Sequence, residues 1–434
     1  MTTTTGTAPT RMAPIAAAAT IATALEWFDF FIYTTAASLV LGKLFFPTFG
    51  GVEGTLASFA TLAVGFIARP VGGIIAGHLG DRWGRKPTLV LALVFMGVST
   101  FGIGLLPTYA TVGALAPALL ILLRVIQGLG VGAQWGGAAL LLTEHAPVRR
   151  RGFYGSFVQV GAIGGAILGT LVYLIITSSM ADPAFESWGW RLPFWTGLVL
   201  IIIGVFLQRR IEDTPVFKRL RADGADKPAA EKPPLISAIK GHWKQILQAA
   251  GAFMVVNTAY YIFISGILSY GTTTLEMPKS TILALVLGAG ATQLVTMPLM
   301  GLLSDRMSRR KLYLTGTVLL GLWAFPLFWL VDTKQPFLMF VGLAVGFTFH
   351  SMMYGPQAAL YAEMFSAGVR YSGASLGYQI ASIFAGGLAP FVMTALLAAT
   401  GASWSVSVYI LVMAVITFAA VFWIKESFQR DLYE

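Results

Sequence analysis

The sequence predicts an all-α membrane protein, with twelve transmembrane helices in two pseudo-symmetric six-helix bundles and both termini in the cytoplasm. Three observations predict this fold class: an apolar composition, a series of apolar stretches that can each cross a bilayer, and a charged loop motif that occurs once in each half. The 434 residues are 56% hydrophobic and only 11% charged. Soluble proteins carry about 25% charged residues, so the composition is typical of a membrane protein.

Each half of the chain contains six apolar stretches of about twenty residues, separated by short polar or Gly/Pro segments. The first six lie near residues 15–41, 55–78, 88–107, 113–142, 155–178 and 190–209. The second six lie near residues 244–271, 280–303, 311–331, 336–361, 372–397 and 404–424. The first stretch could be mistaken for a signal peptide, but it continues past Glu26 and Asp29 and is long enough to span.

The distribution of Lys and Arg predicts the orientation. With the N-terminus in the cytoplasm, 23 of the 29 cations fall on the cytoplasmic side and four on the other, while Arg69 and Arg124 lie within spans. Cytoplasmic loops are enriched in Lys and Arg, so both termini are predicted to be cytoplasmic in a bacterial inner membrane. The net charge of +10 therefore does not require a nucleic-acid partner.

A polar, proline-containing segment divides the chain. The predicted domains are an N-terminal six-helix bundle at 1–209, a cytoplasmic linker at 210–243 and a C-terminal six-helix bundle at 244–434. The basic residues of the linker could alternatively bind lipid headgroups, although the enrichment of cytoplasmic loops in cations already explains them.

One loop motif occurs between the second and third spans and again between the eighth and ninth. It reads GHLGDRWGRK at 77–86 and GLLSDRMSRR at 301–310, an offset of 224 residues. Further along, Glu144 and Glu363 each precede an Arg-x-x-Gly sequence. Two matched loops in the same order predict a duplicated transporter fold.

The loop motif has the form G-x-L-x-D-R-x-G-R-[RK], and on it the chain resembles the major facilitator superfamily over essentially its whole length. Further segments resemble the metabolite:proton symporter family within that superfamily. They are EWFDF at 26–30, ARPxG at 68–72, RxxQG at 124–128 with WGG at 135–137, RGFY at 151–154 and EDTPxF at 212–217. The resemblance implies a symporter that imports a small organic acid or zwitterion with protons by alternating access.

The duplicated loop is predicted to act as a conformational latch. An acid such as Asp81 is stabilised at the positive N-terminus of a neighbouring helix, and the loop cations can pair with acids across the cytoplasmic face. In the family, this loop is thought to hold the halves together when the carrier faces outward. Alternatively its cations only enforce topology, which leaves Asp81 and Asp305 unexplained. The predicted latch residues are Gly77, Asp81, Arg82, Arg85, Glu144, Asp305, Arg306, Glu363 and Arg370.

Four charged residues lie within the spans: Glu26, Asp29, Arg69 and Arg124. An ionised side chain at bilayer depth costs at least about 2.5–3.5 kcal/mol, so each is a functional candidate. Glu26 and Asp29 share a helix face, and Arg69 is predicted at a similar depth, where it could pair with either acid. If an anionic substrate took Arg69, the released acid would accept a proton. The alternative is a structural ion pair that neutralises buried charge.

The second half has neutral residues where the first has charges. An offset of 224 aligns Arg69 with Gln293, while Asn257 and Tyr260 repeat the spacing of the two acids at an offset of 231. Proton coupling, by Glu26 and Asp29, is therefore predicted in the N-terminal half, and hydrogen bonding to substrate in the C-terminal half. The predicted substrate-binding residues are Arg69, Arg124, Gln127, Asn257, Tyr260, Gln293 and Gln357. Residues that could either line the cavity or bond another helix are Gln134, Gln159, Tyr354, Gln379 and His350.

Other classes of protein fit the sequence less well. The chain has no cysteine, no metal-type His/Glu spacing and no P-loop, so we predict no enzyme, cofactor, metal site or ATP-driven transport. A proton-antiporting exporter is the main alternative, but exporters of this superfamily typically have a proline in the glycine-rich motif of span five, and residues 161–169 contain none. A channel or a non-transporting sensor is a further alternative.

The predicted partners are a small-molecule organic acid or zwitterion, protons and the lipid bilayer, and the protein is expected to act as a monomer. Two buried arginines favour a carboxylate substrate. The resemblance leaves shikimate, 2-oxoglutarate, citrate, aromatic acids and betaines open, and a small monocarboxylate of the shikimate kind is our expectation.

Overall fold

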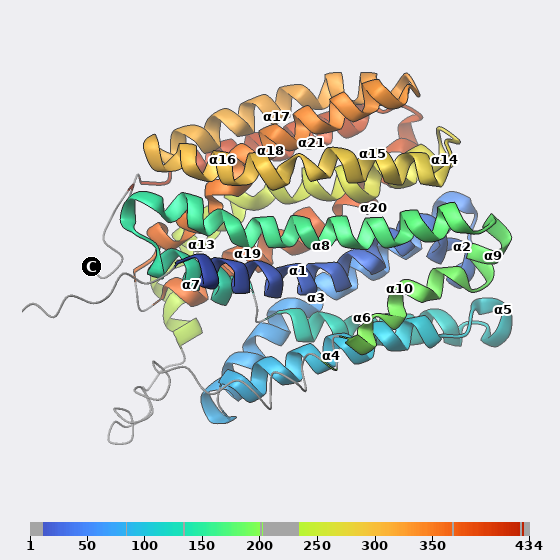
Figure 1. The fold of residues 1–434 in the computed structure, drawn as a ribbon, viewed down its shortest axis with the longest axis horizontal. Coiled ribbons are helices and arrows are strands. Elements are labelled where there is room, and N and C mark those ends of the chain that lie inside the picture. Colours follow the sequence, from blue (N-terminus) through green and yellow to red (C-terminus); the bar gives the residue numbers. More distant parts are fainter. Residues whose placement is uncertain are drawn as a thin grey trace, which may run out of the picture.

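The computed structural model describes residues 12–83, 85–132, 135–199, 202, 234–366, 369–425 and 428. Within these residues, the side chains of 18, 76–90, 135–138, 141, 234–240 and 371 lie outside the description. All secondary structure in the described part is helical, and the long helices run side by side along one axis (Figure 1).

The N-terminal part contains five long helices joined by short ones. They are α1 (Met12–Ala36), its π-helical continuation η1 (Ala37–Leu41), α2 (Gly42–Phe45), α3 (Gly51–Trp83), α4 (Arg85–Leu105), α5 (Tyr109–Val112), α6 (Leu115–Val131), α7 (Trp135–His145), η2 (Val148–Arg150), α8 (Arg151–Ser179), α9 (Asp182–Ser187), η3 (Gly189–Arg191) and α10 (Leu192–Trp195).

The C-terminal part repeats this organisation. Its elements are α13 (Pro234–Tyr261), the π-helical η4 (Ile262–Gly266), α14 (Ile267–Thr273), α15 (Lys279–Ala291), α16 (Gln293–Arg306), α17 (Arg309–Asp332), α18 (Pro336–Met364), α19 (Arg370–Ala381), the π-helical η5 (Ser382–Gly387), α20 (Ala389–Thr400) and α21 (Trp404–Phe422). In Figure 1, α15, α16, α17 and α18 of the second part lie above α1, α3, α4 and α6 of the first, and α8 lies between these groups, along α15 and α16.

Nine helices of the described part are long and apolar enough to cross a bilayer, and Leu91–Leu105 and Leu115–Val131 are shorter apolar helices. Most of the predicted linker at 210–243 and the end of the sixth stretch lie outside the described residues. The total of twelve helices and the domain limits therefore stay predictions.

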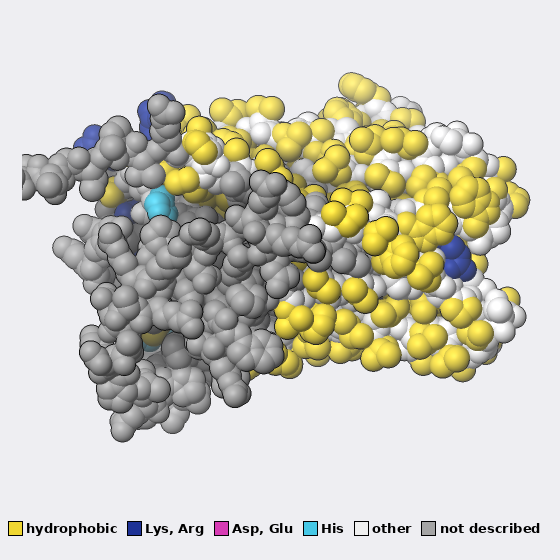
Figure 2. All heavy atoms as spheres, turned by 60° about the horizontal axis from the view of Figure 1, so that its bottom comes forward, with side chains coloured by type: hydrophobic (Ala, Val, Ile, Leu, Met, Phe, Trp, Pro, Cys, Tyr) yellow, Lys and Arg dark blue, Asp and Glu magenta, His cyan; other side chains and the backbone are white. Residues whose placement is uncertain are grey.

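The outer surface is apolar. Side chains such as Val295, Leu322 and Trp329 are each more than 60% exposed. In Figure 2, hydrophobic side chains cover most of the described surface along the middle of the long axis, and the visible Lys and Arg side chains lie towards its ends. Such a surface is unfavourable in water and suits the hydrocarbon core of a bilayer.

Glycines allow two helices to meet closely beneath this surface. A Cβ added at Gly161 or Gly165 of α8 would lie only 2.5 Å from a backbone oxygen of α1, that of Thr20 or Ala24 respectively. The glycine-rich stretch at 161–169 therefore packs α8 directly against α1, the helix that carries the two membrane acids.

The π-helical turns provide a structural comparison of the two parts. The first begins at Ala37 after α1 and the second at Ile262 after α13, an offset of 225 residues. This value agrees with the 224 residues that separate the duplicated loops and differs from the 231 that relates the two membrane acids to Asn257 and Tyr260. On the structural offset, Asn257 lies six residues, or about 9 Å, further along its helix than the equivalent of Glu26.

Candidate functional site

Polar side chains from several helices meet between the N-terminal and C-terminal parts. The structure buries every predicted proton-coupling and substrate-binding residue, with exposed fractions of 9% for Glu26, 3% for Arg69 and 5% for Tyr260, and less than 5% for the others. Because polar groups avoid hydrocarbon, their collection at one place within the bundle marks a candidate transport site, here called the central site.

Gln127 links the second acid to an arginine. Its Nε2 donates a hydrogen bond to Asp29 Oδ2 and another to Thr100 Oγ1, each at 2.8 Å, and its Oε1 accepts one from Arg124 Nη1. The Arg124 guanidinium also lies 3.8 Å from the centroid of the Tyr33 ring. Asp29 and Arg124 are therefore joined through an amide and held in place by it.

Arg69 is held in a different way. Its guanidinium carbon lies 4.6 Å from the centroid of Phe30 and 4.2 Å from that of Phe66. In the described part of the chain, neither Arg69 nor Glu26 makes a hydrogen bond or an ion pair. The ion pair expected between Arg69 and Glu26 or Asp29 is thus not formed. Cation–π contacts, worth about 0.5–2 kcal/mol, hold the cation and leave its N–H donors for a ligand.

The C-terminal face of the central site is neutral. Tyr260 stacks on His350 with ring centroids 5.4 Å apart, and Gln293 Nε2 lies 2.8 Å from His350 Nδ1. Asn257 Nδ2, the Tyr260 hydroxyl and Gln293 Oε1 are buried and have no hydrogen-bond partner among the described residues. A buried polar atom without a partner costs about 1–3 kcal/mol, so such a group is well suited to receive a ligand.

An aromatic seam joins the two faces. Phe30 and Phe66 each contact Tyr261, with centroids 5.9 Å and 5.5 Å apart, and Phe31 contacts Tyr260 at 5.7 Å. Tyr260 was predicted from the sequence, but Phe30, Phe31, Phe66 and Tyr261 were not, because an aromatic side chain in an apolar span has the same pattern whether it faces lipid, the core or a cavity. The sequence feature that could have identified Phe30 and Phe31 is their position directly after Asp29, one of the two membrane acids.

The remaining candidates have different surroundings. Gln357 is fully buried one turn after Tyr354 on α18, and Gln159 is fully buried on α8. Gln379 donates to the carbonyl of Gly132 at 3.3 Å, which is a bond between the two parts. Gln134 lies outside the described residues.

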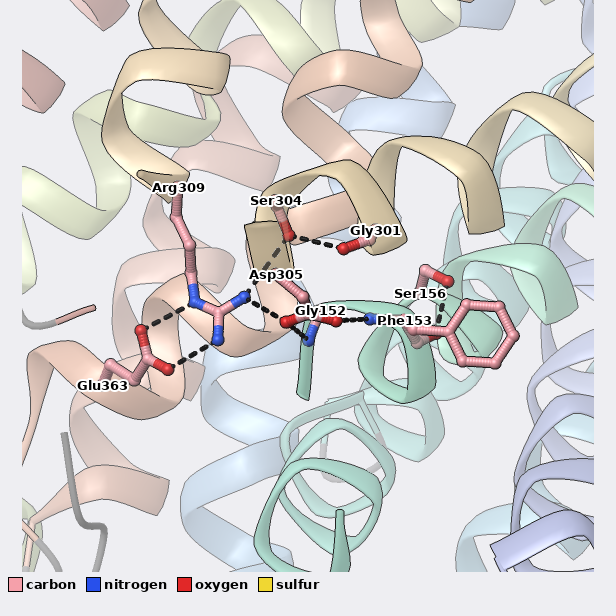
Figure 3. A network of polar contacts seen from close by, with 8 residues as sticks. All are labelled: Gly152, Phe153, Ser156, Gly301, Ser304, Asp305, Arg309 and Glu363. Atoms are coloured by element: carbon pink, nitrogen blue, oxygen red, sulfur yellow. Dashed lines mark hydrogen bonds and ion pairs between the residues drawn. The ribbon is translucent and has the colours of Figure 1, made fainter. Parts of the chain in front are cut away.

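At the end of the bundle that the sequence predicts to be cytoplasmic, Asp305 binds the start of a helix in the other part of the chain. Its two carboxylate oxygens accept hydrogen bonds from the backbone N–H groups of Gly152 and Phe153, each at 2.8 Å, at the N-terminus of α8 (Figure 3). A negative charge is favourable there because the helix dipole and free N–H groups converge. A Cβ on Gly152 would lie 2.3 Å from Ser304 Oγ, so glycine is needed for this approach.

Arg309 completes this network. It donates to Asp305 Oδ1 at 3.0 Å and makes two bonds of 2.8 Å to Glu363 (Figure 3). Arg306, which was predicted to belong to the latch, is exposed and takes no part in the network. Arg309 was missed, although the offset of 224 that relates the two loops places it opposite Arg85.

The other predicted latch residues are only partly described. Glu144 Oε1 accepts from Arg370 Nη1 at 3.1 Å, which joins the two parts at the same end. Gly77 lies within α3, and the side chains of Asp81, Arg82 and Arg85 lie outside the description.

The opposite end of the central site is also bridged. Lys279, at the start of α15, lies 2.9 Å from Asp182 and 3.8 Å from Glu186, both on α9. Glu186 also pairs with Lys43 at 2.8 Å. Contacts between the two parts therefore exist on both sides of the buried charges.

A helical bundle with an apolar belt and buried charges at its internal interface defines a polytopic membrane carrier. The family of sugar (and other) transporters matches residues 15–434, and the chain belongs to this family of the major facilitator superfamily. It is a membrane transporter and not an enzyme.

Relatives match over nearly the whole chain. The shikimate transporter of Escherichia coli is 38% identical over 405 residues, covering 93% of this chain and 92% of the relative. The inner membrane metabolite transport protein YhjE of Escherichia coli is 39% identical, covering 96% and 94%. The proline/betaine transporter of Salmonella typhimurium is 35% identical, covering 96% and 84%. These relatives and the apolar helices identify a multi-pass protein of a bacterial inner membrane.

Solved structures share the fold. A D-xylose-proton symporter superposes with a TM-score of 0.74 at 17% identity, covering 96% of this chain and 98% of that one. The xylose transporter XylE of E. coli, in a partially occluded inward-open conformation, superposes with a TM-score of 0.72 at 18% identity and the same coverage. At this identity the likeness establishes the major facilitator fold.

Proposed function

We propose that this chain is a proton-coupled symporter that imports a small organic acid or zwitterion by alternating access. It has twelve transmembrane helices, two six-helix bundles at 1–209 and 244–434 joined by the linker 210–243, and cytoplasmic termini. The observation that carries the proposal is the burial of two arginines and two acids of the N-terminal part in one region, beside the aromatic residues that contact the C-terminal part. The names of its relatives, which include a shikimate transporter and a proline/betaine transporter, support small metabolites as the substrate class.

The two acids have different roles in this proposal. Asp29 already accepts a hydrogen bond from Gln127, and through it holds Arg124 in position. Glu26 has no hydrogen bond to any described residue. Glu26 is therefore the acid that exchanges the proton, while Asp29 positions Arg124.

Binding proceeds from the charged face to the neutral one. The substrate carboxylate binds the N–H donors of Arg69, which the aromatic rings leave available. The rest of the substrate forms hydrogen bonds with the unpartnered polar atoms of Asn257 and Tyr260. Glu26 takes a proton from the extracellular side, and both ligands leave after the bundles tilt. That movement separates Asp305 from the N-terminus of α8 and Glu144 from Arg370.

Transport in proteoliposomes tests this function. Purified protein is screened by thermal shift against carboxylates and betaines, because a ligand that binds the folded state raises its stability. The best ligand is then offered to vesicles with an acidic exterior, where we expect saturable accumulation against its gradient. Accumulation driven by the opposite proton gradient would identify an exporter, and equilibration without accumulation would identify a channel.

A further inference from the structure

The charges of the central site balance. Two acids, Glu26 and Asp29, face two guanidinium groups, Arg69 and Arg124, and all four are buried. A buried set of charges is stable when its members compensate one another, and an uncompensated charge in the membrane is strongly unfavourable. With both acids ionised, the empty site therefore has no net charge.

Among the described residues, the other groups that surround these charges are neutral. They are Tyr33 of α1, Tyr260 and Tyr261 of α13, Gln293 of α16, His350 and Tyr354 of α18 and Tyr378 of α19. Gln293 Nε2 donates to His350 Nδ1, which leaves that nitrogen as an acceptor and the imidazole uncharged. The C-terminal face therefore contributes hydrogen-bonding groups and no charge to the balance.

Of these four groups, only one acid is available to bind a proton and only one cation is available to bind a substrate carboxylate. Asp29 and Arg124 are joined through Gln127, whereas Arg69 rests on aromatic rings and Glu26 has no hydrogen-bond partner among the described residues. One carboxylate can bind Arg69, and one proton can neutralise Glu26. Binding of a monoanion and a proton together leaves the net charge of the site unchanged.

Other combinations of bound substrate and proton change the net charge of the site. A monoanion without a proton leaves one negative charge, and a zwitterion with a proton leaves one positive charge. A quaternary ammonium group has no N–H or O–H and can make no hydrogen bond to the unpartnered polar atoms of Asn257 and Tyr260.

We propose that the substrate is a monocarboxylate with additional hydrogen-bonding groups, and that each molecule moves with one proton, so that transport is electroneutral. This inference rests on the proposed proton symport and specifies its substrate class and stoichiometry. The proton comes from the extracellular solvent, binds a Glu26 carboxylate oxygen and is released to the cytoplasm with the anion.

The first test is the ligand screen. The panel contains shikimate and benzoate as monocarboxylates, 2-oxoglutarate and citrate as multiply charged acids, and glycine betaine as a zwitterion. We expect the largest thermal shift from a monocarboxylate, and a larger one from shikimate than from benzoate because its hydroxyl groups can bind the C-terminal face. A largest shift from citrate, 2-oxoglutarate or betaine, or no shift from either monocarboxylate, overturns the inference.

The second test separates the pH gradient from the membrane potential in proteoliposomes, with the best ligand as the probe. A gradient of one pH unit at zero potential should accumulate the probe about tenfold, which corresponds to one proton per molecule. An inside-negative potassium diffusion potential at equal pH should have no effect. Uptake driven by that potential, or about a hundredfold accumulation driven by the pH gradient, would show that transport is not electroneutral with one proton per molecule. Either result would leave the proposed proton symport in place. No response to either gradient means that the proposed symport itself is wrong.

The third test uses Glu26→Gln, which resembles the protonated acid. The balance of charge predicts that this variant carries the anion alone, so an inside-positive potential should drive uptake and a pH gradient should not. Asp29→Asn is the matched variant, because it removes the acid that we assign to positioning Arg124. Electrogenic anion uptake in Asp29→Asn and not in Glu26→Gln would show that Asp29 carries the transported proton. That result would overturn the assignment of proton exchange to Glu26.

Discussion

The two faces of the central site satisfy their polar groups in opposite ways. On the N-terminal face, Asp29, Gln127 and Arg124 bind one another, and Arg69 rests on aromatic rings. On the C-terminal face, Asn257 and Tyr260 have buried polar atoms without a partner among the described residues. The charged face is therefore largely organised before substrate arrives, whereas the neutral face is completed by the substrate. This difference predicts that substitutions on the two faces change different steps of transport.

The largest effect is expected on the charged face, at the cation. Arg69→Gln should reduce uptake of a carboxylate by at least about a hundredfold, because it removes the charged donor for the anion. Arg69→Lys is the control and should retain part of the activity, since it keeps the charge but loses the planar arrangement of donors. Initial rates in proteoliposomes measure both. Undiminished proton-coupled uptake by Arg69→Gln would contradict the role of this cation.

Glu26→Gln should separate coupling from binding. Accumulation driven by a pH gradient is expected to disappear, while exchange of substrate across the membrane in counterflow continues. Loss of counterflow together with accumulation would indicate that Glu26 is needed for structure or substrate binding. Thermal-shift titration of the variant with substrate distinguishes these cases.

The cytoplasmic network lies outside both faces and should affect movement alone. Asp305→Asn weakens two charge-assisted bonds at the N-terminus of α8, and we expect turnover to fall about tenfold with little change in substrate binding. Arg306→Gln is the matched control, because Arg306 is in the same loop and exposed. Equal effects of the two substitutions would remove the basis for a latch.

On the neutral face, Tyr260→Phe should raise KM about threefold to tenfold and leave kcat nearly unchanged, because one hydrogen bond to substrate is worth about 0.5–1.5 kcal/mol. Tyr313→Phe is the control, since its hydroxyl donates to the Ala252 carbonyl at 2.7 Å within the C-terminal part. That variant should lose stability and keep its KM. A change of kcat alone in Tyr260→Phe would argue against substrate contact.

The smallest effect is expected at the opposite end of the bundle, which the sequence predicts to be extracellular. Asp182→Asn breaks the bond to Lys279, but the Asp182 side chain is 72% exposed. Exposed ion pairs contribute at most about 1 kcal/mol, so transport should change by less than about twofold. A larger loss, measured as turnover at low salt, would show that this pair controls opening.

The sequence alone predicted the membrane class, the two related halves and the polar residues proposed for the central site. These features follow from local rules: an apolar stretch must reach across a bilayer, and a buried charge within it needs a function. Glu26, Arg69 and Arg124 could be singled out for this reason. Asp305 could be placed at a helix N-terminus, because a loop acid without a solvent role needs a positive partner.

The tertiary structure decided which of these groups meet. Depth along a helix cannot reveal the direction of a side chain, so the sequence pattern allowed an ion pair of Arg69 with an acid, where the structure instead places Phe30 and Phe66 beneath its guanidinium. It also linked Asp29 to Arg124 through Gln127 and assigned Arg309, not Arg306, to the cytoplasmic network. Composition and periodicity act along one chain segment and determine the class of protein. The chemistry of the site depends on side-chain packing between segments far apart in the sequence, and this is specified only when the helices come together.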